Sequence, residues 1–383
     1  MLAIINGTIL TMAGAPIPRG TVLADNGKIL QVGQDIKVPV QAEIIDATGK
    51  IVMPGLIDAH THVGIMEEIY RIEGDDTNET TDPVTPHLRA IDAVNPQDLG
   101  FQDALAGGVT TVVTGPGSAN IVGGQMVAMK THGTVVDEMI IRFPAGLKCA
   151  LGENPKRVYG SKKMPATRMA SAALLRETLA AAQIYLAKQE QAGTEGAKAP
   201  DRDLKLEAVG RVLKGEIPLR VHAHRADDIM TAVRIAREFN VDLVIEHCTE
   251  GHLIAPWLAK AGVKAVVGPI ISNRAKVELM NRSLETAMAL FRHGVPFALM
   301  TDHPVVPVNY LSLSAALAVK GGLPEEEALK ALTINAAKLL GLANRIGSLE
   351  PGKDADIIVL DRPLLDPRHR VEKVIVGGCQ VIN

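Results

Sequence analysis

Two histidines separated by one residue, His60 and His62, follow a short apolar stretch early in this 383-residue chain. Successive side chains of a β-strand point to opposite faces, so two positions spaced i, i+2 share a face. Two imidazoles on one face can bind one metal ion through nitrogen. A single His-x-His pair is weak evidence, because unrelated polar residues where a strand meets solvent would look the same.

Further residues of ligand type follow other apolar stretches, and this recurrence strengthens the metal interpretation. They are Lys148, His222 and His224 (again i, i+2), His247 and Asp302. A histidine at one strand end is usually a structural hydrogen-bonding group. Histidine or aspartate at four strand ends is improbable by chance, so we expect these side chains to meet.

Short apolar stretches alternate with helical patterns over most of the chain, which is typical of βα units. Strands are expected at residues 51–57, 109–114, 139–143, 147–149, 219–223, 243–246, 265–267 and 297–300. The count is close to eight units and predicts an α/β fold built on a (β/α)8, TIM-like barrel. Because the carboxyl ends of barrel strands converge at one mouth, such a barrel would gather the residues above.

Both ends of the chain differ from this pattern. Short β-rich stretches with Asn-Gly turns occupy the first fifty residues, and β character returns after residue 341. We therefore predict a small β-sandwich domain composed of residues 1–52 and 345–383, beside a barrel formed by residues 53–344. Residues 65–96 are polar and acidic, and we expect a long loop over the barrel mouth. The glycine-rich residues 115–124 are expected to form a flexible loop there too.

The chain resembles the metal-dependent amidohydrolase superfamily through several motifs in one order. They are PGLIDAHTH at residues 54–62, the later His222, His247 and Asp302, and GSLEPGKDAD at residues 347–356. The resemblance spans nearly the whole chain, including the split β domain. It is nearest to the branch of imidazolonepropionase and Xaa-Pro dipeptidase (prolidase).

The resemblance implies roles for individual residues. His60 and His62 would bind the more buried metal ion, and His222 and His247 would be further ligands. Asp302 would bind metal and transfer a proton as the catalytic residue. Lys148 stands where two-metal members have a carbamylated lysine that bridges both ions, although the residues around it depart from the usual pattern. Glu153 lies nearby in the sequence and could replace that bridge. One or two divalent ions are implied, with Zn²⁺ as the first expectation and other divalent metals left open.

Besides Glu153, which is also a candidate for binding substrate, three more residues near these motifs are candidates for that role. His224 shares a face with His222, so it could be a ligand or a substrate contact, and a position lining the mouth is the favoured interpretation. Arg225 and His303 could hold a substrate carboxylate or carbonyl, or could be solvated loop residues.

The predicted function is hydrolysis of a C–N bond in an amide, cyclic amide or dipeptide by metal-activated hydroxide. A divalent ion lowers the pKa of bound water to about 7, which makes hydroxide available at neutral pH. A deaminase of the same superfamily is one alternative, which Lys148 disfavours because single-metal deaminases need no bridging lysine. A non-catalytic barrel scaffold is the other, and it would not need the ligands.

Composition restricts the partners. Net charge is −3, with 40 basic and 43 acidic residues that form no basic stripe, so nucleic acid is not expected. No apolar stretch is long enough to cross a membrane. Three scattered cysteines imply no disulfide framework, and the cytoplasm is the expected compartment. We expect a small-molecule substrate, and the sequence leaves open whether the chain forms a homo-oligomer.

Overall fold

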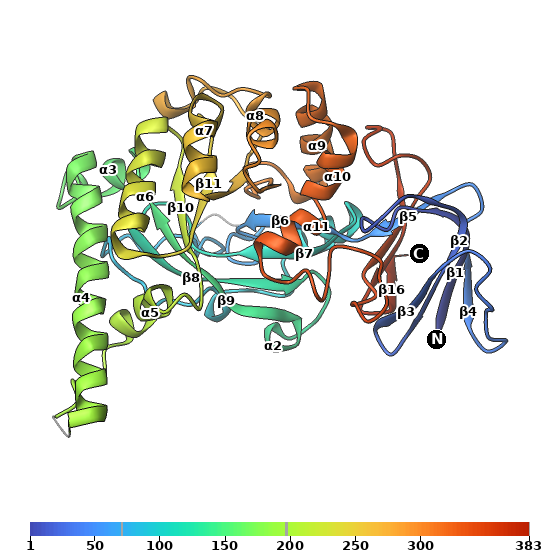
Figure 1. The fold of residues 1–383 in the computed structure, drawn as a ribbon, viewed down its shortest axis with the longest axis horizontal. Coiled ribbons are helices and arrows are strands. Elements are labelled where there is room, and N and C mark those ends of the chain that lie inside the picture. The colour runs from blue at the N-terminus through green and yellow to red at the C-terminus, as the bar shows by residue number, and fades with distance from the viewer. Residues whose placement is uncertain (70–71, 196–197, 383) are drawn as a thin grey trace.

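The computed structural model describes residues 1–69, 72–195 and 198–382, and its centre is a curved sheet (Figure 1). Within the described residues this sheet has eight strands in the order β13-β12-β11-β10-β9-β8-β7-β6. Their bounds are β6 Leu56–Thr61, β7 Val109–Thr114, β8 Val122–Lys130, β9 Ile140–Ala150, β10 Leu219–Ala223, β11 Leu243–His247, β12 Lys264–Val267 and β13 Phe297–Leu299. Backbone bonds at the end of β6 and just beyond β13 nearly close the barrel: the His62 N–H donates to the His303 carbonyl (2.9 Å), and the Asp302 N–H donates to the His60 carbonyl (3.2 Å).

The barrel departs from eight regular βα units at β8. This strand pairs antiparallel with both β7 and β9, whereas the other pairs of the sheet are parallel. The predicted flexible loop at 115–124 therefore ends inside a strand, and the strands expected at 139–143 and 147–149 are one continuous strand, β9. Gly124 allows the close approach that β8 requires, because a Cβ there would lie 2.7 Å from the Leu88 carbonyl oxygen at a φ of +142°.

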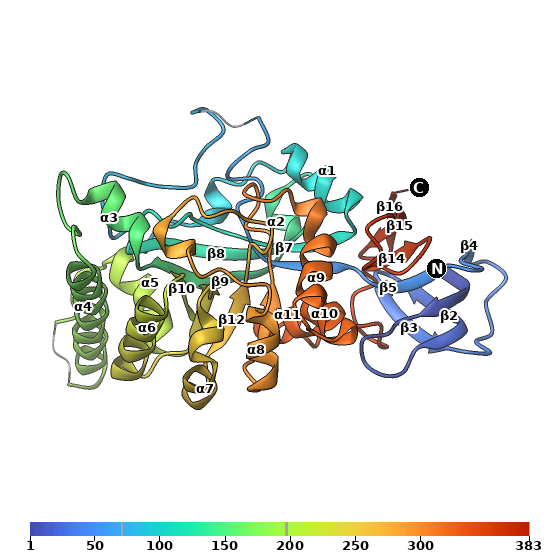
Figure 2. The same ribbon diagram turned by 90° about the horizontal axis from the view of Figure 1, so that it is seen from above.

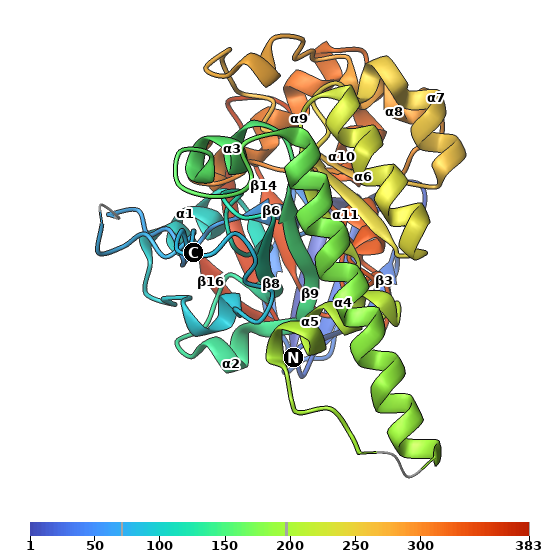
Figure 3. The ribbon, with the colours of Figure 1, turned by 90° about the vertical axis from the view of Figure 1, so that its left-hand side faces the viewer.

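Helices cover the outer face of the parallel strands, and Figures 2 and 3 show the longest, α4, at one side of the molecule. Their bounds are α1 Leu99–Ala106, α2 Val136–Met139, α3 Glu153–Tyr159, α4 Arg168–Glu195, α5 Leu204–Leu213, α6 Ala226–Phe239, α7 Gly251–Ala261, α8 Thr286–Arg292, α9 Leu311–Lys320, α10 Glu325–Ala331 and α11 Ile334–Leu339, with 3-10 turns η1 Ala90–Asp92, η2 Val277–Leu279 and η3 Val308–Tyr310. Among the helices of the described residues, none combines the length and hydrophobicity that a membrane span requires.

A second sheet joins the two ends of the chain and lies beside the barrel (Figure 1). Its strands are β1 Leu2–Ile9, β2 Ile17–Asp25, β3 Lys28–Gly33, β4 Glu43–Asp46, β5 Ile51–Pro54, β14 Ile357–Leu360, β15 Val371–Val376 and β16 Cys379–Ile382. The join is the antiparallel pair of β5 with β14. Over the described residues hydrogen bonds connect all of these strands into one sheet, so the two separate sheets of the expected β-sandwich are not seen. This sheet has its own apolar core.

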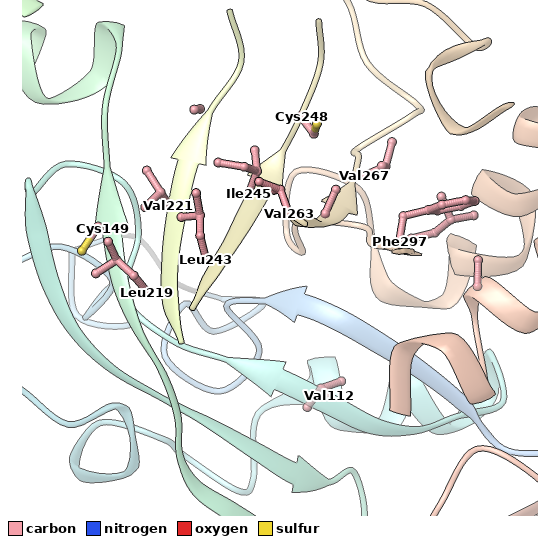
Figure 4. Close-up of a cluster of buried hydrophobic side chains, with 14 of the residues drawn as sticks. Val112, Cys149, Leu219, Val221, Leu243, Ile245, Cys248, Val263, Val267 and Phe297 are labelled. Carbon is pink, nitrogen blue, oxygen red and sulfur yellow. The ribbon is translucent and has the colours of Figure 1, made fainter. Parts of the chain in front are cut away.

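Alternation along the barrel strands separates an outer apolar face from an inner face. In β10, Leu219 and Val221 pack outward with Leu243 and Ile245 of β11, as Figure 4 shows, under the surrounding helices. The intervening side chains must then point into the barrel. Those inward positions include the charged or polar Lys148, Arg220, His222 and Glu246, all buried.

Residues 65–96 form few regular elements, as expected for a loop at the mouth. Residues 70–71 of this segment lie outside the described part of the chain. Met66, Thr77 and Asn78 line the cavity at the mouth. The segment therefore contributes one wall of the space above the strand ends.

Candidate active site

The first cluster of polar groups gathers at the ends of β6 and β13. Nε2 of His60 lies 3.3 Å from Oδ1 of Asp302, and Nε2 of His62 lies 3.5 Å from the same oxygen. Two ligand atoms bound to one tetrahedral ion at about 2.1 Å lie about 3.4 Å apart. These three side chains therefore have the spacing that a divalent ion requires.

Lys148 of β9 extends into the same cluster. Its Nζ lies 3.4 Å from Nε2 of His60 and donates to the carbonyl of Pro116 at 3.2 Å. Burial of this amine, with 1% of the residue exposed, lowers its pKa to about 8. A lysine with a lowered pKa is partly neutral near pH 7, the state in which an amine can react with carbon dioxide.

A second cluster is formed by His222 of β10, His224 just after it, and His247 at the end of β11. One ligand nitrogen of each lies within 4.8 Å of the others, and the rings of His222 and His247 have centroids 4.2 Å apart. The ring of His247 is also 5.7 Å from that of His60, so the two clusters adjoin. Burial lowers the pKa of His222 and of His247 well below the usual value, which leaves both imidazoles neutral and able to bind metal.

The backbone turns sharply at two of these residues. His247 has a φ of +71° and Asp302 a φ of +58°, both in the left-handed region. This conformation costs a residue other than glycine about 1 kcal/mol. The turn redirects each side chain where its strand ends, and strain of this kind is concentrated at functional sites.

Asp302 is held as a carboxylate by its neighbours. Burial by itself would raise its pKa, but His247, His60 and His62 outweigh that effect and hold the pKa well below its usual range. The Asp302 side chain is 12% exposed and borders the cavity. It is therefore a charged oxygen donor that a substrate can reach.

A buried ion pair lies beneath the first cluster. Arg220 donates to Oε1 of Glu246 and, at 2.7 Å, to the carbonyl of Ala59. Oε2 of Glu246 lies 3.0 Å from Nδ1 of His60. Burial would raise the pKa of Glu246, but Arg220 and His60 together lower it to about 2. Glu246 therefore stays negative and favours the His60 tautomer with hydrogen on Nδ1, which leaves Nε2 free.

The sequence-based interpretation assigned no role to Arg220 or Glu246. It also missed Glu278, a buried carboxylate in η2 that lies 3.6 Å from Nε2 of His224. Arg220 and Glu246 could have been found from the sequence, because each is a charged residue at an inward position of an apolar strand. No pattern in the sequence marks Glu278.

A cavity of about 730 Å³ opens above both clusters, a volume suited to a small molecule. Six candidate residues line it: His62, Lys148, His222, His224, His247 and Asp302. Lys276 adds a positive charge to its wall, and Asn78 and Asn154 add amides.

Three candidate substrate contacts lie away from this cavity. Arg225, directly before α6, is bound to the Asp227 carboxylate on the surface. His303 is fully buried: its Nδ1 accepts from the Val308 N–H, and its Nε2 lies 3.5 Å from Glu68. Glu153, at the start of α3, donates its backbone N–H to Glu278. None of the three is among the residues that line the cavity, within the part of the chain described.

Comparison with known proteins decides the family. The family model described as "Amidohydrolase family" matches residues 51–381. The chain belongs to the amidohydrolase family. It is thus a hydrolase of C–N bonds, in a family that uses divalent metal ions.

Named relatives place this amidohydrolase more closely. It is 27% identical to an imidazolonepropionase of Geobacillus kaustophilus, over 96% of this chain and 91% of the relative. It is 30% identical to the amidohydrolase tasK of Hapsidospora irregularis over 89% of this chain, but spans only 38% of that protein's length. A crystal structure of an amidohydrolase from Thermotoga maritima MSB8 matches with a TM-score of 0.97 and 48% identity over all of both chains. A prolidase complexed with N-methylphosphonate-L-proline, 20% identical with a TM-score of 0.64 over 100% of this chain and 99% of the other, shares the fold.

Proposed function

We propose that this amidohydrolase cleaves an amide or cyclic amide C–N bond in a small substrate that carries a carboxylate. The observation that carries the proposal is the convergence of His60, His62, Lys148 and Asp302 at ligand spacing beneath the cavity. Relatives named imidazolonepropionase, and structures named prolidase and Xaa-Pro dipeptidase, support this class of substrate.

The donor set fits one or two divalent ions. Imidazole and carboxylate donors in a buried site suit Zn²⁺, our first choice, and other first-row ions. His60, His62 and Asp302 would hold the inner ion, and His222 and His247 the outer one. Lys148, once carbamylated, would hold both. Bound metal would acidify a water molecule and polarise the scissile carbonyl.

The chain's own residues would supply the rest of the chemistry. Asp302 would accept a proton at a carboxylate oxygen and return it to the leaving nitrogen. Lys276 would pair with the substrate carboxylate. Among the described residues that line the cavity, the lysines are Lys148 and Lys276, and Lys148 is assigned to the metal ions. This pairing replaces the role first expected of Arg225 and His303, which do not line the cavity. We further propose that residues 1–52 and 345–383 form a composite domain beside the barrel of residues 53–344.

The test begins with elemental analysis of gently purified protein and of protein titrated with Zn²⁺. We expect one to two ions per chain, and absence of binding under both conditions would overturn the proposal. The loaded enzyme is then screened against dipeptides, N-acyl amino acids, imidazolones and cyclic ureas, each with a counterpart in which the carboxylate is amidated. Turnover should favour the carboxylates, and ammonia release is measured in the same screen to detect a deaminase.

Asp302→Asn tests the proton transfer. At saturating metal we expect kcat to fall by about 10²–10⁴-fold, the usual contribution of a positioned acid or base. Asp242→Asn is the matched control, because Asp242 is half exposed in a surface pair with Lys264. Turnover of the Asp302 variant at the wild-type rate would refute this role.

A further inference from the structure

The second cluster contains one imidazole more than the proposed outer ion requires. His222 and His247 are its proposed ligands, yet His224 lies equally close to them. Its ring centroid is 4.6 Å from that of His222 and 4.4 Å from that of His247. His224 is 4% exposed, so its imidazole is enclosed with the other two and is not a solvated group at the rim.

The ring of His224 is oriented in the way that metal-binding histidines are. Its Nδ1 is paired with Oγ1 of Thr249 at 2.7 Å, as Nδ1 of His247 is paired with the Gly268 carbonyl at 3.0 Å. An oxygen that accepts the N–H of one ring nitrogen leaves the other nitrogen available to the ion; the Gly268 carbonyl can only accept, and the Thr249 hydroxyl can accept in the same way. For both histidines the nitrogen left over is Nε2.

Several ring nitrogens of the cluster have no hydrogen-bond partner within the described residues. This holds for Nε2 of His224 and for both ring nitrogens of His222. A buried polar atom without a partner is destabilising, because it has lost its hydrogen bonds to water. Several such atoms in one cluster, with one ligand nitrogen of each ring within 4.8 Å of the others, indicate a site built for a ligand that accepts nitrogen lone pairs.

A carboxylate completes the set. Glu278 is 1% exposed, and its Oε2 accepts the Glu153 N–H at 3.0 Å. Its Oε1 has no hydrogen-bond partner in the described part of the chain and lies 3.6 Å from Nε2 of His224 and 3.9 Å from Nε2 of His222. These separations are close to the spacing of about 3.4 Å between donors on one tetrahedral ion. Lys276, 3.6 Å from the same oxygen, partly balances the charge of Glu278.

We propose that His224 and Glu278 are ligands of the outer ion, so that three imidazoles and a carboxylate would hold it together with the bridging carbamate of Lys148. This inference rests on the proposed function, because it deepens the description of the same metal centre. This set of nitrogen and oxygen donors suits zinc, cobalt or iron and disfavours Mg²⁺ and Ca²⁺, which prefer oxygen ligands alone. Glu153 takes part through its backbone N–H, which positions Glu278, and not as a bridging carboxylate.

The alternative is that His224 and Glu278 are a structural pair lining the mouth. The two interpretations predict different metal contents for the variants His224→Ala and Glu278→Gln. After apo protein is reloaded with excess Zn²⁺ and desalted, each variant should hold one ion fewer per chain than the wild type. His252→Ala is the matched control, since His252 lies in α7 and pairs with Thr286 outside the cavity. It should bind as many ions as the wild type.

A spectroscopic measurement keeps the test independent of activity. Co²⁺-loaded wild type and variants are compared by visible absorption, and the Zn²⁺ forms by X-ray absorption, which counts imidazole ligands. Loss of the outer-ion signal in both variants, with the inner-ion signal retained, supports the proposal and also shows that they are folded. Variants with the metal content and spectra of the wild type overturn it but leave the proposed function intact. A wild type that binds no metal overturns both.

Discussion

Glu246→Gln tests how the protein holds the inner cluster. The carboxylate of Glu246 contacts two cationic or donor groups at once, the Arg220 guanidinium and Nδ1 of His60. A glutamine amide has a single acceptor oxygen, so it cannot serve both. If the glutamine oxygen accepts from Arg220, His60 loses the group that orients it. If it accepts from His60, Arg220 loses its hydrogen bond. In both cases the charge of Arg220 is no longer neutralised.

The expected loss of stability in Glu246→Gln follows from the burial of the ion pair. Arg220 and Glu246 are both 0% exposed, and removing one partner of a buried ion pair costs about 3–5 kcal/mol. Unfolding entropy of about 2.1 cal/mol/K per residue gives about 0.8 kcal/mol/K for 383 residues. The melting temperature of the apo protein should therefore fall by about 4–6 °C. Loss of the group that orients a metal-binding histidine should weaken the inner ion by about 10–100-fold.

The assay measures both quantities in one preparation. Differential scanning fluorimetry of apo protein gives the melting temperature, and Zn²⁺ titration against a competing chelator gives the affinity. Glu238→Gln is the matched control, because Glu238 makes a surface pair with Arg176 and is about half exposed. Such a pair contributes at most about 1 kcal/mol, so the control should melt within about 1 °C of the wild type.

A double variant separates stability from metal binding. Replacing both members of a buried ion pair by apolar residues of similar volume is often neutral. Arg220→Met with Glu246→Met should therefore recover most of the lost melting temperature. Its metal affinity should stay low, because His60 still lacks its carboxylate. If Glu246→Gln melted and bound Zn²⁺ as the control does, the orienting role of Glu246 would be refuted.

Two further predictions concern Lys130 and Lys148. Lys130 of β8 contacts Asp354 at 3.1 Å and also Asp356, so Lys130→Met should destabilise the protein by about 3 kcal/mol, measured by thermal melting against the exposed-pair control Lys264→Met. Burial would raise the pKa of Asp354, but Lys130 and Lys28 outweigh that effect and lower the pKa. The stabilisation by this pair is therefore present above about pH 4 and is lost as pH falls through the lowered pKa. The melting temperatures of wild type and variant should converge in acid, and a constant difference down to pH 2 would contradict this account. For Lys148, apo enzyme reloaded with Zn²⁺ should regain activity faster when bicarbonate is added, whereas Lys148→Arg should not respond; equal responses would exclude a carbamylated lysine.

Much of the site could be predicted because its signals are local. His60 and His62 stand two residues apart after an apolar stretch, and so do His222 and His224. Strand periodicity places such pairs on one face, and convergence of strand ends in a barrel then places the faces together. The pairing of the two chain ends into one sheet was also foreseeable, because both ends have the same alternating β character.

The parts that were missed depend on distance through space. Strand β8 begins among glycines, and local propensity favours a loop there, yet Gly124 allows a close approach to the segment at Leu88. Arg225 and His303 stand next to proposed ligands in the sequence, but one turns to Asp227 and the other is buried away from the cavity. The position of a residue along the chain predicts the face it occupies only while the strand continues. Arg225 and His303 follow the end of a strand, so their directions could not be predicted in this way.

Glu246 and Glu278 show two different limits of inference from sequence. Glu246 sits at an inward position of an apolar strand, so its burial could have been inferred, and a buried carboxylate requires a cationic partner. Arg220, at the equivalent face of the neighbouring strand, was available as that partner. Glu278 comes from a short turn after β12, and its approach to His224 depends on how that segment folds back over the mouth. The inner cluster is therefore determined mainly by strand alternation, whereas the outer one also depends on a loop. Substitutions at Glu278 should change the metal content of the outer cluster and leave the barrel and the inner cluster intact.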